Sequence, residues 1–288
     1  MTGPFRYFVH SCRIASALLV LVALGALWSI AFTKSSSGAA AAAYYGYCPD
    51  GSASAVYYMY CPPPRLPQHF TGYEIDSQTP AIHGEDLVLE DQFVRETVHR
   101  GQQPKLLLTP VEKRRQGRTP EPIQRAEEHL KCWRLTGGAR QDRSVRVSNQ
   151  FVANRELIVK EPTRLCAPAS KSLQGPPAQP PSDTQHYKCY RVEERPRLAE
   201  ETLDLVDQFG TRRVVIRRAD LLCNPVTKER ASGERVVAPR PEEHLVCYAI
   251  TSATSFTRQT AFTLDQFGRQ SVRVVAPEVL CVPSTKIG

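Results

Sequence analysis

Four histidines recur at nearly equal intervals, and three of them are followed by a cysteine at the third position. The histidines are His69, His129, His186 and His244. Imidazole and thiolate both ligate zinc, so His-x-x-Cys with a later cysteine is one pattern of a structural zinc site. A fourth ligand is absent, however, and His69 is retained in a segment that lacks both cysteines. We therefore expect a structural role, with each histidine hydrogen-bonded to neighbouring backbone at a strand start, and no metal or other cofactor.

An acidic or amide residue followed by Gln-Phe is the second recurring group. Its four copies begin at Asp91, Asn149, Asp207 and Asp265. A repeated carboxylate is a candidate calcium ligand, but Asn149 replaces it once and no second acid stands at ligand spacing. A side-chain oxygen that accepts nearby backbone N–H groups is typical of turns. The trio therefore predicts a turn whose phenylalanine anchors the core.

Familiar catalytic motifs are missing from the sequence. It contains no Gly-x-Ser-x-Gly, no His-Glu-x-x-His and no phosphate-binding glycine loop. Four similar units without a unique polar cluster fit binding or scaffolding better than catalysis. We expect a non-catalytic protein, and the alternative is an enzyme whose site forms between repeats.

Six cysteines occupy two fixed positions in three of the units. They are Cys132 with Cys166, Cys189 with Cys223, and Cys247 with Cys281. In the first unit Gly72 and Leu108 align with these positions, so both cysteines are missing together. Joint loss indicates a disulfide within each unit, because bridges between units would leave unpaired partners elsewhere. Cys48 and Cys61 then pair with each other by elimination.

The elements that position these groups are short strands in a fourfold repeat. The units are 69–113, 129–171, 186–228 and 244–288, and the linkers are 114–128, 172–185 and 229–243. Apolar residues alternate with polar ones, as in Val145-Arg-Val147, and Phe209-Gly210 places a permissive glycine between two such runs. The prediction is three or four strands per unit, in an all-β tandem array of small disulfide-stapled units. Pairing of the units into two sandwiches is an option. The first unit lacks a disulfide, so it must be stabilised by contacts with its neighbours.

Residues 1–43 have the pattern of an export signal. Arg6 and Arg13 precede an uncharged run over 14–32, and small residues continue to Ala43. The run is also long enough to cross a bilayer, so an uncleaved single-pass anchor is the alternative to a secreted protein. In both cases residues 44–288 lie outside the cytoplasm, where disulfides persist.

The lead-in at 44–68 is rich in tyrosine and is a candidate binding surface for sugars or proteins. Its tyrosines are Tyr44, Tyr45, Tyr47, Tyr57, Tyr58 and Tyr60.

The net charge of +8 is too small for a nucleic-acid-binding signature. The second unit is basic and the first acidic, so they are candidates to dock together. An anionic cell-surface polymer, a glycan or a protein is a candidate partner for such a surface, and a membrane is one only if the N-terminal helix is retained.

The combination His-x-x-Cys-Tyr, Asp-Gln-Phe-Gly and Leu-Cys-x-Pro resembles a cysteine-paired tandem repeat of unknown function found in exported bacterial proteins. Residues 186–225 and 244–283 match most fully, whereas Trp133 and Asn149 depart from the pattern. The resemblance implies export, repetition and cysteine pairing, and it brings no activity or catalytic residue. We expect a binding or structural repeat protein at the bacterial envelope or outside the cell, with a membrane-tethered stalk as a further alternative.

Overall fold

The computed structural model describes residues 45–47, 53–55, 68–196 and 198–287. The chain divides into two compact units, residues 1–63 and 64–288. In the first unit, β1 (Tyr45–Tyr47) pairs antiparallel with β2 (Ala53–Ala55). The second unit contains all four repeats, and its described elements are strands. The predicted all-β class is confirmed.

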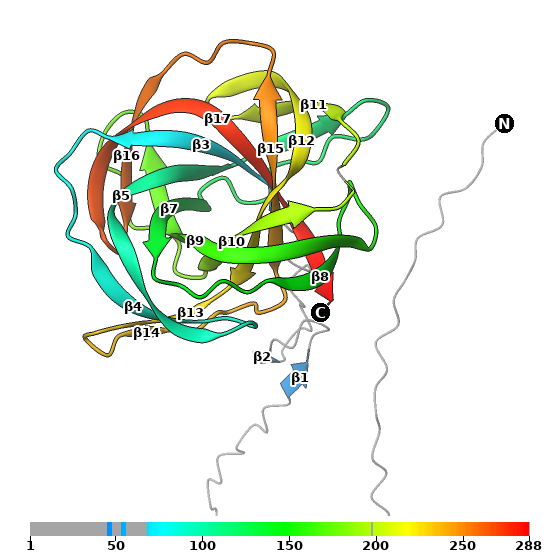
Figure 1. Ribbon diagram of the computed structural model, residues 1–288. Coiled ribbons are helices and arrows are strands. Elements are labelled where there is room, and N and C mark those ends of the chain that lie inside the picture. Colours follow the sequence, from blue (N-terminus) through cyan, green and yellow to red (C-terminus); the bar gives the residue numbers. More distant parts are fainter. Residues whose placement is uncertain (1–44, 48–52, 56–67, 197, 288) are drawn as a thin grey trace, which may run out of the picture. The chain divides into compact units, whose positions relative to one another are not determined.

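Eight antiparallel strands of the second unit form a closed ring, and each repeat contributes two of them (Figure 1). In ring order they are β3 (Phe70–Ser77), β5 (Arg95–Pro110), β7 (His129–Thr136), β9 (Arg155–Ser172), β10 (Tyr187–Glu194), β12 (Gly210–Pro225), β15 (His244–Ser252) and β17 (Gly268–Ile287). Pairing of β17 with β3 closes the ring, so the last repeat is hydrogen-bonded to the first. Closure leaves the ring without free strand edges.

The remaining strand of each repeat forms a hairpin with the first half of the following long strand. These hairpin strands are β4 (Glu85–Glu90), β8 (Arg143–Ser148), β11 (Glu201–Asp207) and β16 (Gln259–Asp265). Their outer edges pair with the last strand of the repeat two places along. Thus β8 of the second repeat pairs with the end of β17 of the fourth, and β16 of the fourth pairs with the end of β9 of the second. The first and third repeats exchange strands in the same way, because β11 pairs with β6 (Glu112–Arg115) and β4 pairs with β13 (Thr227–Arg230).

The number of strands per repeat agrees with the expected three or four, whereas the length of some strands differs from the expectation. The second and fourth repeats have three strands, and the first and third have four, because β5 and β12 are each followed by a separate short strand. After the turn, where short strands were expected, one long strand such as β9 pairs first within the hairpin and then within the ring. The long strands bend at irregular pairings near their middle, which lets one strand take part in two layers. Part of the predicted linkers is strand, because Arg114 and Arg115 lie in β6, and Arg235 and Val236 form β14.

The predicted disulfides lie between neighbouring ring strands. Cys132 is bonded to Cys166, Cys189 to Cys223, and Cys247 to Cys281, each pair directly opposite in register. Gly72 and Leu108 are opposite each other in the same way in the first repeat. A cluster of buried residues from all eight strands contains the six cysteines together with Leu108, so the staples and the leucine fill the interior of the ring.

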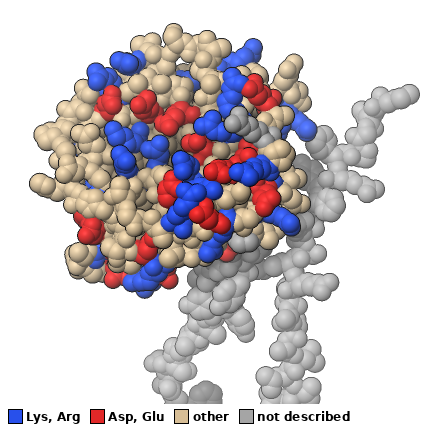
Figure 2. All heavy atoms as spheres, in the orientation of Figure 1, with Lys and Arg blue, Asp and Glu red and all other residues tan. Residues whose placement is uncertain are grey.

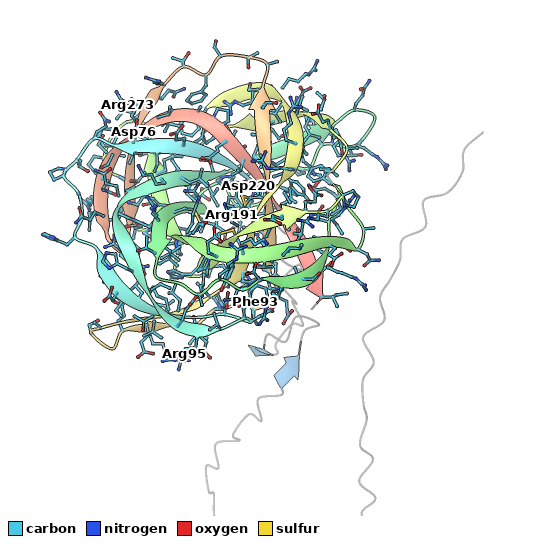
Figure 3. The ribbon with its side chains drawn as sticks, in the orientation of Figure 1. Asp76, Phe93, Arg95, Arg191, Asp220 and Arg273 are labelled. Carbon is cyan, nitrogen blue, oxygen red and sulfur yellow. A yellow bond between two sulfur atoms is a disulfide. The ribbon has the colours of Figure 1, made fainter. Side chains whose placement is uncertain are left out.

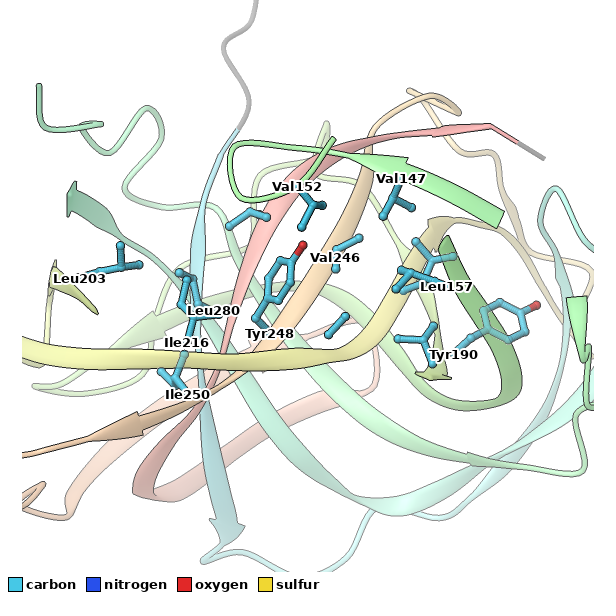
Figure 4. Close-up of a cluster of buried hydrophobic side chains, with 14 of the residues drawn as sticks. Val147, Val152, Leu157, Tyr190, Leu203, Ile216, Val246, Tyr248, Ile250 and Leu280 are labelled. Carbon is cyan, nitrogen blue, oxygen red and sulfur yellow. The ribbon is translucent and has the colours of Figure 1, made fainter. Parts of the chain in front are cut away.

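A second apolar layer lies between the ring and the hairpins that cover it. Its largest cluster includes Val147 and Leu157 of the second repeat with Tyr248 and Leu280 of the fourth (Figure 4). The same cluster includes residues of the third repeat, such as Tyr190 and Ile216. The four repeats therefore share their core as well as their sheet, which is why they form a ring rather than two separate sandwiches.

Candidate functional site

A cavity of about 330 Å³ opens at the end of the ring where the histidine-bearing strands begin. Its floor consists of one apolar residue from each repeat, the residue that follows the histidine. These are Phe70, Leu130, Tyr187 and Leu245, all buried. Alternation along the strands places the disulfides one layer deeper, so the cavity ends at the stapled core. We call this space the end cavity.

The residue before each histidine lines the end cavity near its mouth. It is Gln68 or Gln185 in the first and third repeats, and Glu128 or Glu243 in the second and fourth. Each glutamate pairs with an arginine three residues earlier, Arg125 with Glu128 and Arg240 with Glu243, both at 2.7 Å. The side-chain oxygen of Gln68 accepts the backbone N–H of Arg125, and that of Gln185 accepts the N–H of Arg240. The ion pairs neutralise the carboxylates close to an otherwise apolar floor.

Three polar atoms of residues lining the end cavity are buried without a hydrogen-bond partner. They are Nε2 of Gln185, Oγ1 of Thr184 and Nδ1 of His244, in residues that are 1%, 4% and 2% exposed. Burial of a polar atom without a partner is costly, so these atoms favour a ligand that hydrogen-bonds to them. The amide is a donor, which calls for an oxygen acceptor. The arrangement suits a small molecule with an apolar body and an oxygen-bearing end.

The predicted turns are present, and the Asp or Asn side chain organises each of them. Asp265 Oδ1 accepts the backbone N–H groups of Phe267 and Gly268 at 2.9 and 3.1 Å, and Asn149 Oδ1 accepts that of Phe151 at 2.9 Å. Gly268 has φ of 137° and Gly210 of 109°, conformations that favour glycine, as expected for a hairpin.

Each turn is also bound by the repeat two places along. The phenylalanine packs edge-on against an aromatic residue of that repeat: Phe209 against Tyr73 at 4.7 Å, Phe267 against Trp133, Phe93 against Tyr190, and Phe151 against Tyr248. Tyr73 donates its hydroxyl to Asp207 at 2.5 Å, and Trp133 donates its indole N–H to Asp265 at 2.8 Å. The turns therefore lock the diagonal pairs of repeats together.

The histidines and the closing lysines of one repeat hold the turn of the next. His69 Nε2 lies 3.0 Å from Gln150 Oε1, and His186 and His244 contact Gln266 and Gln92 in the same way, both at 3.3 Å. At three of the four sites the partner is a glutamine side chain rather than the backbone predicted from the sequence; His129 has a backbone partner in Leu108. Each lysine lies over the phenylalanine of the same turn, as Lys171 does over Phe209 at 4.2 Å. The four lysines are Lys113, Lys171, Lys228 and Lys286.

Burial keeps the histidines uncharged. Desolvation and the nearby Lys171 lower the pKa of His129 to about 3, and desolvation with Lys228 or Lys286 lowers those of His186 and His244 to about 4. Within the described ranges no three His, Cys, Asp or Glu side chains form a group that could hold a metal ion. The histidines thus fasten the repeats to one another.

A second opening lies at the opposite end of the ring, beyond the disulfide layer. It has a volume of about 640 Å³ and is lined by Lys105, Arg134, Arg164 and Arg191 with Glu161 and Asp220. Figure 3 shows Arg191 and Asp220 near the middle of the ring. Arg191 pairs with Glu161 at 2.8 Å and Arg164 with Glu278 at 3.5 Å. Cations and anions are intermixed over the face shown in Figure 2, so this charged mouth is no uniformly basic surface for an anionic polymer.

The acidic first repeat and the linker that follows it form ion pairs with the third repeat and the linker that follows that repeat. Glu96 binds the fully buried Lys188 at 2.5 Å, Arg115 binds Glu201, and Glu85 binds Arg230 at 3.2 Å. These ion pairs follow the diagonal strand exchange, whereas Arg191 with Glu161 and Lys160 with Glu193 join the neighbouring second and third repeats. The suggestion that the acidic and basic neighbours dock through their charges does not account for these pairs.

Several predicted features fall outside the described residues. These are the signal or anchor at 1–43, the Cys48–Cys61 pair, Tyr44, Tyr57, Tyr58 and Tyr60, and the side chains of Tyr45 and Tyr47, whose backbone forms β1. In the described part of the chain, no helix has the length and hydropathy of a membrane span. The three disulfides are typical of an oxidising, extracytoplasmic compartment.

The lining of the end cavity was not singled out from the sequence. A signal for it exists: Arg-x-Glu-Glu-His-Leu occurs at 125–130 and again at 240–245, and Gln-His-aromatic occurs at 68–70 and 185–187. The alternation of Glu and Gln marks the diagonal relation of the repeats. Only the ring shows that these four positions converge on one space.

The ring, its diagonal strand exchange and its interior disulfides define a class of protein: an all-β domain built from four interlocked repeats, three of which contain a disulfide. The chain matches the family model described as Repeat of unknown function (DUF7450) over residues 133–283, more than half of its length, and belongs to this family. No curated protein and no solved structure matches the chain.

Proposed function

We propose that this is an exported, non-catalytic binding protein of the bacterial envelope or the extracellular space. Its ligand is a small, mainly apolar molecule with an oxygen acceptor at one end, held in the end cavity. The observation that carries the proposal is the convergence of four apolar side chains beneath three unpartnered polar atoms, Gln185 Nε2, Thr184 Oγ1 and His244 Nδ1. Sites for small molecules are commonly concave, apolar and supplied with a few polar groups, at volumes of about 300 Å³ and above.

The role as a binder rather than an enzyme is supported by the engagement of the charged groups at the mouth. Glu128 and Glu243 are paired with Arg125 and Arg240 at 2.7 Å, an arrangement that positions groups for recognition. Export is supported by the pattern of residues 1–43 and by the three disulfides. N-terminal sequencing of the natural product distinguishes a secreted protein, which begins near Tyr44, from a tethered one.

Isothermal titration of the disulfide-bonded protein with decan-1-ol, decanoate and indole tests the binding proposal. Binding of decan-1-ol or decanoate is expected, since each combines an apolar body with an oxygen acceptor. Leu130→Trp places an indole in the floor of the cavity and should abolish this binding. Leu173→Trp, at a position 39% exposed in the linker, is the matched control and should bind like the parent.

Folding of both variants is checked by disulfide mapping and circular dichroism. Equal binding by the two folded variants would place the ligand elsewhere. Failure of the folded parent to bind both decan-1-ol and decanoate would overturn the proposed ligand class, whether or not indole binds.

A further inference from the structure

Lysine, asparagine and aspartate side chains from three different repeats meet near the end of the last strand. Lys286 Nζ donates a hydrogen bond to Asn224 Oδ1 at 2.9 Å. Asn224 Nδ2 in turn donates to Asp91 Oδ2 at 3.2 Å. Asn224 is completely buried. An amine, a carboxamide and a carboxylate thus form a chain of two hydrogen bonds, with the carboxamide in the middle.

The surroundings hold these three groups in place and reduce the charge on the amine. Asp91 Oδ1 accepts the N–H groups of Phe93 and Val94 at 3.0 and 3.1 Å, which leaves Oδ2 directed at Asn224. Lys286 Nζ lies 4.2 Å from the centre of the Phe93 ring. Burial lowers the pKa of Lys286 to about 8, against an opposing effect of Asp91. A substantial share of the amine is therefore neutral, and nucleophilic, at mildly alkaline pH.

The trio occurs at one of the four repeat positions. Every repeat has the lysine, but the residue equivalent to Asn224, the one before the proline at the end of the ring strand, is Thr109, Ala167 or Val282 in the others. None of these side chains carries a carboxamide. A buried asparagine is costly unless its polar atoms are engaged, so its presence at this position alone calls for an explanation.

We propose that Lys286 and Asn224 form an intramolecular isopeptide bond. The neutral Nζ attacks Cγ of Asn224, a bond forms between Nζ and Cγ, and the bond between Cγ and Nδ2 breaks. The Asp91 carboxylate accepts a proton from Nζ and delivers it to Nδ2, which leaves as ammonia. An amine and a primary amide become a secondary amide and ammonia, with no change in oxidation state. The product ties β17 of the fourth repeat covalently to β12 of the third.

The chain gives this reaction little competition at Asn224. Loss of ammonia from asparagine ordinarily proceeds through attack by the backbone nitrogen of the following residue, which gives a cyclic imide. That residue is Pro225, which has no N–H. A loss of ammonia at Asn224 would therefore report attack by another nucleophile.

Intact mass spectrometry of the exported, disulfide-bonded protein is the direct test. The mass should fall below that of the oxidised chain by one ammonia, and a proteolytic map should contain one branched peptide that joins the segments around residues 224 and 286. Lys286→Arg should restore the missing mass. Lys228→Arg, which removes the equivalent lysine of the third repeat, is the matched control and should keep the loss.

Asp91→Asn tests the proton transfer. The second repeat has Asn149 at the equivalent turn position and folds with it, so this variant should fold while bond formation becomes slow or absent. The proposal is overturned if the folded parent, with its disulfides mapped, has the full mass. It is equally overturned if the ammonia loss persists in Lys286→Arg.

Discussion

Burial and a nearby lysine disfavour the protonated form of the repeat histidines. His129 is 2% exposed, and the lysine that closes the same repeat lies nearby and contributes to lowering its pKa. The same pair of residue types flanks the turn at His186 and His244. A neutral imidazole is therefore part of the way one repeat holds the next, and its protonation opposes the folded state.

Acid should destabilise the ring. The unfolded chain takes up protons at histidines with a pKa of about 6.5, whereas the folded protein does so only near 3 to 4, so stability is lost as the pH falls through that window. The slope is up to about 1.4 kcal/mol per pH unit for each buried histidine. Asp207, whose pKa burial raises to about 6, acts in the opposite direction and offsets part of one histidine. Urea unfolding at a series of pH values from 7 to 4 measures the effect.

His129→Gln should reduce that slope by about one histidine's share, because it removes a group that protonates only on unfolding. His83→Gln, at an exposed position in the first repeat, is the control and should leave the slope unchanged. Identical slopes for the parent and His129→Gln would contradict the account.

At the scale of elements, the first repeat shows what replaces a staple. Leu108 occupies the interior where a cystine would lie, opposite Gly72. A Cβ added at Gly72 would lie 2.9 Å from Leu108 Cδ2 and 2.5 Å from Val279 Cγ2. The first contact disappears when Leu108 is replaced, but the second remains. Glycine is needed here because its neighbours fill the space.

A fourth disulfide introduced by Gly72→Cys with Leu108→Cys should therefore stabilise the folded protein less than the opposite positions of these two residues would suggest. With Val279→Ala added, the fourth bridge should form fully, and closing its loop contributes about 3–4 kcal/mol against the cost of the lost methyl groups. Gly72→Cys alone should be destabilised by the two close contacts. Non-reducing peptide mapping and thiol counting give the outcome, and a free thiol pair in the folded triple variant would refute the geometry.

Much at this scale follows from sequence. The repeat, the turns and the pairing of cysteines within units can be read from residues such as Asp265 and Cys247, because a turn or a hairpin staple depends on partners close in the chain. The pairing of β8 with β17 cannot. The four repeats are so alike that no pattern of apolar residues says whether a strand edge prefers the next repeat or the one after it. The end cavity was missed for the same reason, since its four floor residues meet only when the ring closes.

At the scale of the whole molecule, no repeat is an independent folding unit that could be removed without disrupting the others. The first repeat pairs with the second through β5 and β7, with the third through β4 and β13, and with the fourth through β3 and β17. It compensates for its missing cystine through contacts with all three others. Stability is therefore a property of the ring, which sets this domain apart from solenoids whose repeats contact only their neighbours.

The antiparallel pairing of β17 with β3 resembles the strand pairing between every other two successive repeats. The ring itself therefore does not require the chain to begin at the first repeat. A circular permutant should exploit this: its chain begins at His186, runs to Gly288, continues through a copy of 172–185 and resumes at Gln68 to end at Ser172. We expect it to fold with the same three cystines, because the new connection joins positions equivalent to those that 172–185 joins in the parent. Peptide mapping and thermal unfolding would show this, and scrambled cystines would mean that synthesis must begin with the unstapled repeat. If the permutant folds, the gene for such a ring is free to begin at any of its four repeats.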